Sequence, residues 1–168
     1  MRIDTEELLQ ELWGHVYGAA YSVTGSRMDA EDAAQDAFVR YHTCRKEFEN
    51  REHIRAWLIR VAVNRARDLA GAFWRRNRVS LEDAPELQEN APGADEEQVR
   101  AEKMRDLRRA VWSLPGKYRA VLYLYYYEDC PCEEIAKALG MTSAGVRKRL
   151  SRARGMLKEL LSEEWKDD

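Results

Sequence analysis

The sequence is poor in cysteine and proline and has no long apolar run. Its 168 residues include three cysteines and four prolines. So few cysteines argue against a disulfide framework, and Cys130 and Cys132 have no histidine nearby to complete a tetrahedral zinc site. The longest apolar stretches, such as AWLIRVAV, are far shorter than the roughly 20 residues that span a bilayer. The acidic start also lacks the apolar core of a signal peptide. We therefore expect a cytoplasmic chain that holds no metal or cofactor and does not insert into a membrane.

Strand-like alternation and catalytic motifs are missing as well. No stretch alternates cleanly between apolar and polar residues. There is no glycine-rich phosphate loop, no G-x-S-x-G motif and no cluster of metal ligands, and the three histidines pair with nothing. The composition, 45% hydrophobic and 35% charged, is typical of a soluble globular protein. We expect an all-α protein that is not an enzyme.

A net charge of -2 conceals strong segregation of charge along the chain. Residues 51–78 contain eight arginines against two acidic residues, whereas residues 82–97 contain seven acidic residues and no lysine or arginine. Residues 147–158 are basic again, apart from neutral positions. A phosphate backbone interacts with this local charge and not with the net charge of the whole chain. The net charge therefore does not argue against a polyanionic partner.

Helical periodicity predicts three helices in the first half. The first runs over about residues 5–23. The second has Asp29 as its N-cap, Asp32 three positions later, and one buried stripe. The third begins near residue 52 and buries Trp57 with its aliphatic neighbours, which we favour over a base-stacking role for this ring. The stripe of the second helix consists of Ala30, Ala33, Ala34, Ala37, Phe38 and Tyr41.

Residues 80–95 are acidic, aperiodic and rich in proline, which predicts a linker. Helical spacing resumes over residues 96–114, and Pro115-Gly116 ends it. We expect one further helix over residues 117–129 and a turn at Cys130-Pro131. The sequence therefore predicts two small helical modules joined by an acidic linker.

Residues 133–157 have the pattern of a helix-turn-helix. Ala136 provides the small residue where two helices cross, Gly140 the turn, and Val146 the anchor of the second helix. Thr142 or Ser143 can cap that helix, whose outer face is basic. The pattern favours a DNA-recognition helix over a solvated basic face on an ordinary helical hairpin, although such short motifs also arise by chance.

Longer stretches carry a family resemblance. LPGKYRAVLYLYYYEDCPCEEIAKALGMTSAGVRKRLSRAR closely resembles region 4 of the sigma-70 family of transcription initiation factors. DAEDAAQDAFVRYH and RAWLIRVAVNRARDLAGAFWRR resemble region 2 of that family. The order of the blocks is similar to that of extracytoplasmic-function (ECF) sigma factors. The resemblance implies a region 2 module over residues 1–79, a linker over 80–95 and a region 4 module over 96–165.

The resemblance implies roles for individual residues. In region 2, the family positions that contact the clamp coiled coil of the polymerase β′ subunit match Asp32, Gln35 and Asp36. The alternative interpretation is that these side chains belong to an acidic face that is merely exposed to water. The family position that recognises a flipped promoter base matches Asn64, and arginines nearby hold phosphates. Region 4 is expected on the promoter -35 element and the β flap. The implied -10 contacts are Asn64, Arg65, Arg67, Arg75 and Arg76, and the implied -35 contacts are Ser143, Arg147, Lys148, Arg149 and Arg152.

Two departures from the family pattern limit what carries over. Ala144-Gly145 stands where many relatives have Gly-Thr, which removes a hydroxyl contact, so no known -35 sequence is transferred. ENREH replaces the common Gly-Asp after Phe48. The acidic linker is either a polyanion mimic in the polymerase channels or a plain tether.

The resemblance implies three partners: core RNA polymerase, promoter DNA and a cognate anti-sigma factor. Rival interpretations are a dimeric helix-turn-helix repressor or activator, an anti-sigma or adaptor protein, and an enzyme. None of these explains both the region 2 blocks and the basic helix.

Overall fold

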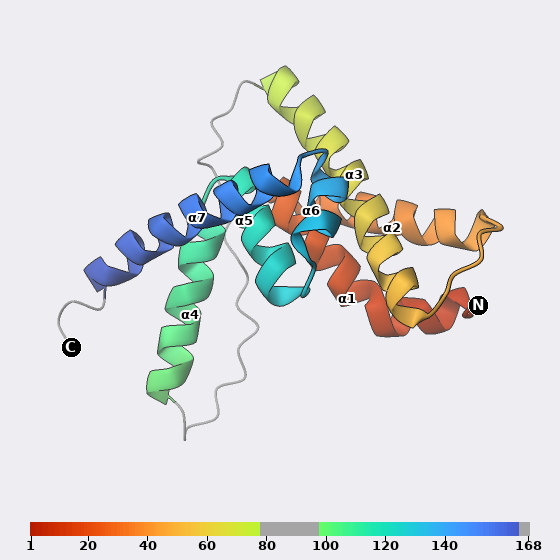
Figure 1. The fold of residues 1–168 in the computed structure, drawn as a ribbon, viewed down its shortest axis with the longest axis horizontal. Coiled ribbons are helices and arrows are strands. Elements are labelled where there is room, and N and C mark those ends of the chain that lie inside the picture. Colours follow the sequence, from red (N-terminus) through yellow and green to blue (C-terminus); the bar gives the residue numbers. More distant parts are fainter. Residues whose placement is uncertain (78–97, 165–168) are drawn as a thin grey trace.

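The computed structural model describes residues 1–77 and 98–164, and in these ranges all regular secondary structure is helical (Figure 1). No strand occurs in either range, so the prediction of an all-α fold is confirmed. The linker predicted over residues 80–95 lies outside the described residues. None of the described helices combines the length and apolarity that crossing a membrane requires. The elements are α1 (Thr5–Thr24), α2 (Arg27–Thr43), α3 (Arg51–Asn77), α4 (Gln98–Ser113), α5 (Gly116–Leu122), the π-helical turn η2 (Tyr123–Tyr127), α6 (Cys132–Leu139) and α7 (Ser143–Glu164).

Helices α1, α2 and α3 pack against one another around a shared core. The apolar stripe predicted on α2 is buried along its whole length. Four of its six residues are alanines, whose small side chains let the neighbouring helices approach closely. Trp57 lies partly buried at the edge of this core, with its ring centroid 5.5 Å from that of Phe48 and 6.4 Å from that of Tyr41. The predicted core position of Trp57 is confirmed.

The connection between α1 and α2 corrects the predicted N-cap. Gly25 adopts the left-handed conformation at φ 63°, and its N–H donates to Tyr21 O at 2.8 Å, which ends α1. Ser26 then caps α2, because its hydroxyl accepts from the backbone N–H of Asp29 at 3.3 Å. The prediction that Asp29 is the N-cap was wrong, since the earlier Ser26 already reaches the third amide of the helix.

The single helix predicted over residues 117–129 changes its hydrogen bonding midway. Helix α5 gives way at Tyr123 to the wider turn η2, in which Glu128 N–H donates to Tyr123 O at 3.2 Å. Glu128 ends the element, and Asp129 follows it with a positive φ of 53°. Hydrophobic periodicity does not distinguish a regular turn from one widened by a residue. The widened turn affects the packing of the molecule, because Glu128, directly after η2, has a completely buried side chain.

The two modules form one body in this structure. Helix α5 packs on α1, and α6 packs on α3, as Figure 1 shows. The buried apolar side chains of both halves belong to one continuous cluster. The predicted helices leave this arrangement open, because a linker of this composition permits modules that are packed or apart.

Candidate nucleic-acid interface

Helices α6 and α7 form the predicted helix-turn-helix. Gly140 ends α6 in the left-handed conformation, with φ 65°. Thr142 caps α7, because its Oγ1 accepts from Gly145 N–H at 3.0 Å. The predicted anchors, Ala136 and Val146, are both buried. The turn and its packing therefore follow from the local sequence.

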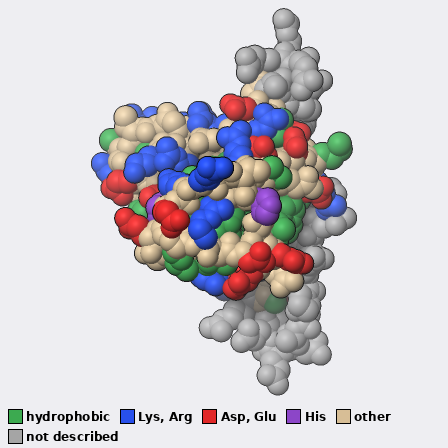
Figure 2. Space-filling model, turned by 90° about the vertical axis from the view of Figure 1, so that its right-hand side faces the viewer, with side chains coloured by type: hydrophobic (Ala, Val, Ile, Leu, Met, Phe, Trp, Pro, Cys, Tyr) green, Lys and Arg blue, Asp and Glu red, His purple; other side chains and the backbone are tan. Residues whose placement is uncertain are grey.

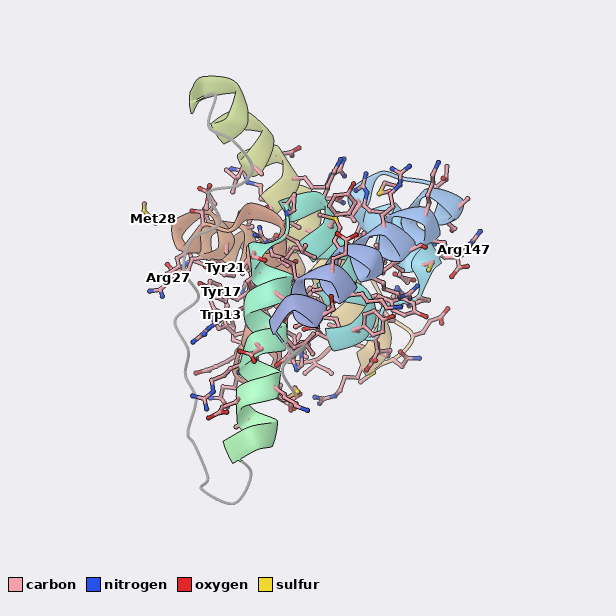
Figure 3. The ribbon with its side chains drawn as sticks, turned by 90° about the vertical axis from the view of Figure 1, so that its left-hand side faces the viewer. Trp13, Tyr17, Tyr21, Arg27, Met28 and Arg147 are labelled. Carbon is pink, nitrogen blue, oxygen red and sulfur yellow. The ribbon has the colours of Figure 1, made fainter. Side chains whose placement is uncertain are left out.

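The outer face of α7 carries the candidate -35 residues. Arg147, Lys148 and Arg152 are exposed, and none of them forms an ion pair within the described part of the chain. Ser143 and Arg149 lie half-buried at its sides. Figure 3 shows Arg147 pointing away from the body of the molecule. The face is cationic and free to contact phosphates or base edges.

Arg154, two residues beyond Arg152 on α7, is held by aromatic rings. Its Nε donates to Tyr126 Oη at 2.5 Å, and its guanidinium lies 5.4 Å from the centre of that ring and 5.7 Å from that of Tyr125. Tyr126 and Tyr127 are themselves exposed. In this arrangement Arg154 is engaged with η2, which separates it from the free arginines of α7.

Three candidate -10 residues follow one another on α3. The Oδ1 atom of Asn64 accepts from Arg67 Nη1 at 3.4 Å. Arg67 also donates to Ala138 O near the end of α6, at 3.2 Å. Arg65 lies 4.0 Å from the carboxylate of Asp32 on α2. A candidate DNA-binding residue and a candidate polymerase-binding residue are therefore neighbours at this point. Helix α3 continues through Arg75 and Arg76, whose side chains lie outside the described residues.

The acidic face of α2 is uncovered. Asp32 and Gln35 are exposed, and Asp36 is half-buried, with its Oδ2 3.0 Å from Arg40 Nε but outside hydrogen-bond geometry. In the described structure α2 packs mainly on α1 and α3, and Arg2 and Ile3 contact Tyr41 near its C-terminal end. Exposed Met28 and Val39 flank the acidic side chains, and Figure 3 shows Met28 projecting from the surface. The sequence analysis missed both, although they lie at helical spacing from Asp32 and Gln35.

A buried polar cluster connects the two modules, and sequence reasoning missed it. The carboxylate of Glu128 lies 2.9 Å from His15 Nδ1 and 2.7 Å from Arg55 Nη2, and it accepts from Tyr123 Oη at 3.1 Å. Burial, followed by repulsion from Glu128, raises the pKa of Tyr123 above its ordinary value. The expectation that the histidines pair with nothing was therefore wrong, since His42 Nδ1 also lies 2.9 Å from Thr5 Oγ1 and His53 Nδ1 accepts from Glu49 N–H at 3.1 Å. No signal in the sequence links His15 and Arg55 with Glu128, because they are far apart along the chain.

A second contact between the modules involves a buried arginine. Arg119 on α5 is 4% exposed, and its Nε donates to Ser22 O on α1 at 2.8 Å. Its guanidinium lies 5.3 Å from the centre of the Trp112 ring. Burial lowers the pKa of Arg119 to about 10, while the nearby Tyr21 opposes this shift. The contact adds a directional constraint to the apolar packing of α5 on α1.

Charge is mixed on one face of the molecule. On the face drawn in Figure 2, lysine and arginine side chains lie among acidic ones, without one continuous basic surface. The cationic residues with a nucleic-acid interpretation are therefore those of α3 and α7, identified by their place on the helices and not by a dominant patch.

Two family models match the chain in succession. The model for sigma-70 region 2 matches residues 8–79, and the model for sigma-70, region 4 matches residues 104–157. The first match covers α1 to α3 and the second covers most of α4 and the elements after it. The matches thus coincide with the two helical modules.

Named relatives agree with these matches. The chain is 32% identical over 161 residues to the ECF RNA polymerase sigma factor SigE of Mycolicibacterium smegmatis, covering 94% of this chain and 61% of that protein. It is 30% identical over 151 residues to the probable RNA polymerase sigma factor RfaY of Xanthomonas campestris pv. campestris, covering 87% of this chain and 37% of that protein. The chain therefore spans less than two thirds of the length of either relative.

A solved structure has the same fold. The sigma factor RpoE of Bartonella quintana, in complex with the anti-sigma factor NepR, superimposes with a TM-score of 0.69 at 22% identity. The match covers 94% of this chain and 96% of that one. The shared fold thus extends over both helical modules.

Proposed function

Because the chain belongs to the sigma-70 family of transcription initiation factors, we propose that it is an RNA polymerase sigma factor of the ECF group. The observation that carries the proposal is the succession of a region 2 match and a region 4 match on two separate helical modules. In this proposal the chain binds core polymerase in the cytoplasm, recognises -10 and -35 promoter elements and promotes DNA melting. It catalyses no reaction itself.

We assign residues 1–79 to the region 2 module, 80–95 to the linker and 96–165 to the region 4 module. The uncovered face of α2 is the proposed docking surface for the β′ clamp coiled coil. The carboxylates of Asp32 and Asp36 provide charge complementarity, Gln35 offers hydrogen bonds between them, and the exposed Met28 and Val39 add apolar contact area. An uncovered helix face of this composition suits a helical partner.

Promoter DNA is proposed to contact α3 and α7. On α3, the amide of Asn64 pairs with the edge of an unstacked base, while Arg65 and Arg67 neutralise phosphates, with Arg75 and Arg76 further along the helix. On α7, Arg147, Lys148 and Arg152 face the major groove, with Ser143 and Arg149 beside them. The region 4 module is also proposed to contact the β flap.

An anti-sigma factor completes the proposed partners. RpoE, which shares the fold, is in complex with the anti-sigma factor NepR in its solved structure. A comparable partner for this chain would cover the docking face of α2 or hold the two modules together.

The test is co-elution of the purified chain with bacterial core RNA polymerase on gel filtration at moderate salt. An Asp36→Arg variant reverses a charge at the edge of the proposed docking face, where burial of the site amplifies the repulsion. Glu6→Arg reverses an exposed charge on α1 as the matched control. We expect the native chain and the control to co-elute with polymerase, and the Asp36→Arg variant to co-elute weakly.

A different outcome would favour another function. If the native chain elutes apart from the polymerase while binding duplex DNA tightly by itself, it is a conventional helix-turn-helix repressor. In that case the face of α2 is a solvated surface and the region 2 match reflects ancestry alone.

A further inference from the structure

The carboxylate of Glu128 is a buried charge at the contact between the two modules. It comes from the end of η2, in the second module, and is 0% exposed. Its charged partner is Arg55 on α3, which is 17% exposed at its side chain, and His15 on α1 contacts it from the other side. We call His15, Arg55, Tyr123 and Glu128 the Glu128 cluster.

The cluster is organised around the Arg55 guanidinium. Its Nη2 atom donates both to the Glu128 carboxylate at 2.7 Å and to the Glu128 backbone carbonyl at 2.5 Å. One cation thus fixes the side chain and the backbone of the residue that ends η2. A buried charge that loses such a partner is strongly unfavourable, so the packed arrangement depends on both members of the pair. When the modules separate, water solvates both groups.

The same packing occupies a candidate promoter residue. Arg67 on α3 donates to Ala138 O of α6, and its Nη2 atom lies 2.9 Å from the position that a Cβ on Gly140 would take. The proposed -10 surface of α3 therefore touches the first helix of the helix-turn-helix directly. Figure 1 shows α6 lying across α3.

This contact is incompatible with simultaneous binding of both promoter elements. The -10 and -35 elements are separated by roughly 25 base pairs, or about 85 Å at 3.4 Å for each pair. In the packed arrangement Arg67 of one module lies 3.2 Å from the carbonyl of Ala138 in the other. The modules must separate before the chain can bind a promoter through both, whereas the face of α2 is already uncovered.

We propose that the Glu128 cluster holds the free chain in a closed state, in which the region 4 module covers Arg67 and the chain cannot span a promoter. Opening exchanges the Arg55–Glu128 pair for water and releases Arg67 from α6. The conclusion about promoters rests on the proposed function, whereas the role of the cluster in holding the modules together does not.

The test is small-angle X-ray scattering of the full chain, alone, with circular dichroism to check that the helices are intact. Glu128→Gln keeps the shape of the side chain and removes its charge, which leaves the partly buried Arg55 guanidinium with only the exposed Glu52 carboxylate as a counter-ion. Glu133→Gln removes an exposed charge five residues further along as the matched control. We expect the native chain and the control to scatter as the closed form.

For Glu128→Gln we expect a larger radius of gyration and an open fraction that rises on the order of tenfold. A folded Glu128→Gln variant with the native radius of gyration would overturn the proposal. If this variant loses its helices, His15→Ala decides, because the His15 side chain is 45% exposed and its loss leaves the ion pair in place. We then expect a smaller shift in the same direction, and no shift would reject the cluster as the closing contact.

A double-mutant cycle separates the pair from general destabilisation. If Arg55 and Glu128 act on opening through each other, Arg55→Met combined with Glu128→Gln opens the chain less than the sum of the two single effects. Additive effects would contradict the proposal. These measurements need no polymerase, so they test the closed state independently of the proposed function. If Glu128→Gln opens the chain but the native chain does not co-elute with polymerase, the closed state is supported and the proposed function is rejected. If the native chain co-elutes but Glu128→Gln does not open it, the proposed function is supported and the closed state is rejected.

Discussion

Cys130 shows how burial changes the chemistry of one side chain. It follows the Glu128 cluster directly and is 9% exposed, whereas Cys44 and Cys132 are half-buried. Burial, opposed by the nearby Arg55, raises the pKa of the Cys130 thiol to about 11. Because only the thiolate is nucleophilic, this thiol is unreactive at neutral pH.

We predict that Cys130 is alkylated by iodoacetamide much more slowly than Cys44 and Cys132 at pH 8. A raised pKa means that less thiolate is present, so the rate at Cys130 should climb as the pH approaches 11. Tandem mass spectrometry of tryptic peptides after timed labelling measures all three sites in one sample, and fragmentation separates Cys130 from Cys132, which share one peptide. Labelling of Cys130 as fast as Cys132 would show that the turn opens readily.

At the scale of elements, the helix-turn-helix follows from local sequence and the π-helical turn does not. Gly140 and Thr142 set the end of α6 and the start of α7 through contacts with their own neighbours. In η2, by contrast, the widened turn places Tyr123 and Glu128 in contact, and the hydrogen bond between their side chains stabilises the irregular backbone. Helical periodicity predicts the first kind of feature because it depends on nearest neighbours alone.

We predict that Arg149→Ala lowers the salt dependence of DNA binding. Arg149 flanks the exposed face of α7, and from this position we expect it to contact a phosphate. Losing one phosphate contact should reduce the slope of log K against log salt concentration by about 0.9 and weaken binding to all duplexes alike. Titration of fluorescent duplex DNA with core polymerase and the variant checks this, with Lys117→Ala on α5 as the control. An unchanged slope would exclude the phosphate contact.

At the scale of the whole molecule, the packing of the modules depends on a close approach between α1 and η2. A Cβ at Gly18 would collide with the hydroxyl of Tyr123, the same group that donates to Glu128. Gly14, one turn earlier on α1, has nothing within 4 Å of its Cβ position. An alanine at Gly18 therefore collides with Tyr123, whereas the same substitution at Gly14 meets no neighbouring atom.

We predict that Gly18→Ala separates the modules and Gly14→Ala does not. At Gly14 the change should stabilise α1 by roughly 0.5–1 kcal/mol, as expected for alanine in a helix. At Gly18 the collision should displace Tyr123 and enlarge the scattering radius while the helices persist. Thermal unfolding and scattering of both variants measure these effects. Equal behaviour of the two variants would show that the closed packing tolerates a methyl group there.

The amino-acid sequence by itself determined the all-α fold, the buried stripe of α2 and the helix-turn-helix with its basic outer face. These features arise from residues three to four positions apart, whose spacing on a helix is fixed by its geometry. The sequence also placed Asn64 and the arginines of α3 on one helix. The start of α2 was misplaced because two capping side chains, Ser26 and Asp29, lie within three residues of each other.

Only the tertiary structure decided how the modules lie and which polar groups they bury. Arg55 and Glu128 are 73 positions apart, and His15 and Glu128 are 113 apart, so no local pattern connects them. The burial of Glu128 also requires the widened turn η2, which periodicity does not detect. Contacts across such separations form when apolar surfaces of distant helices pack together, and the polar groups between them must then find partners or stay in water.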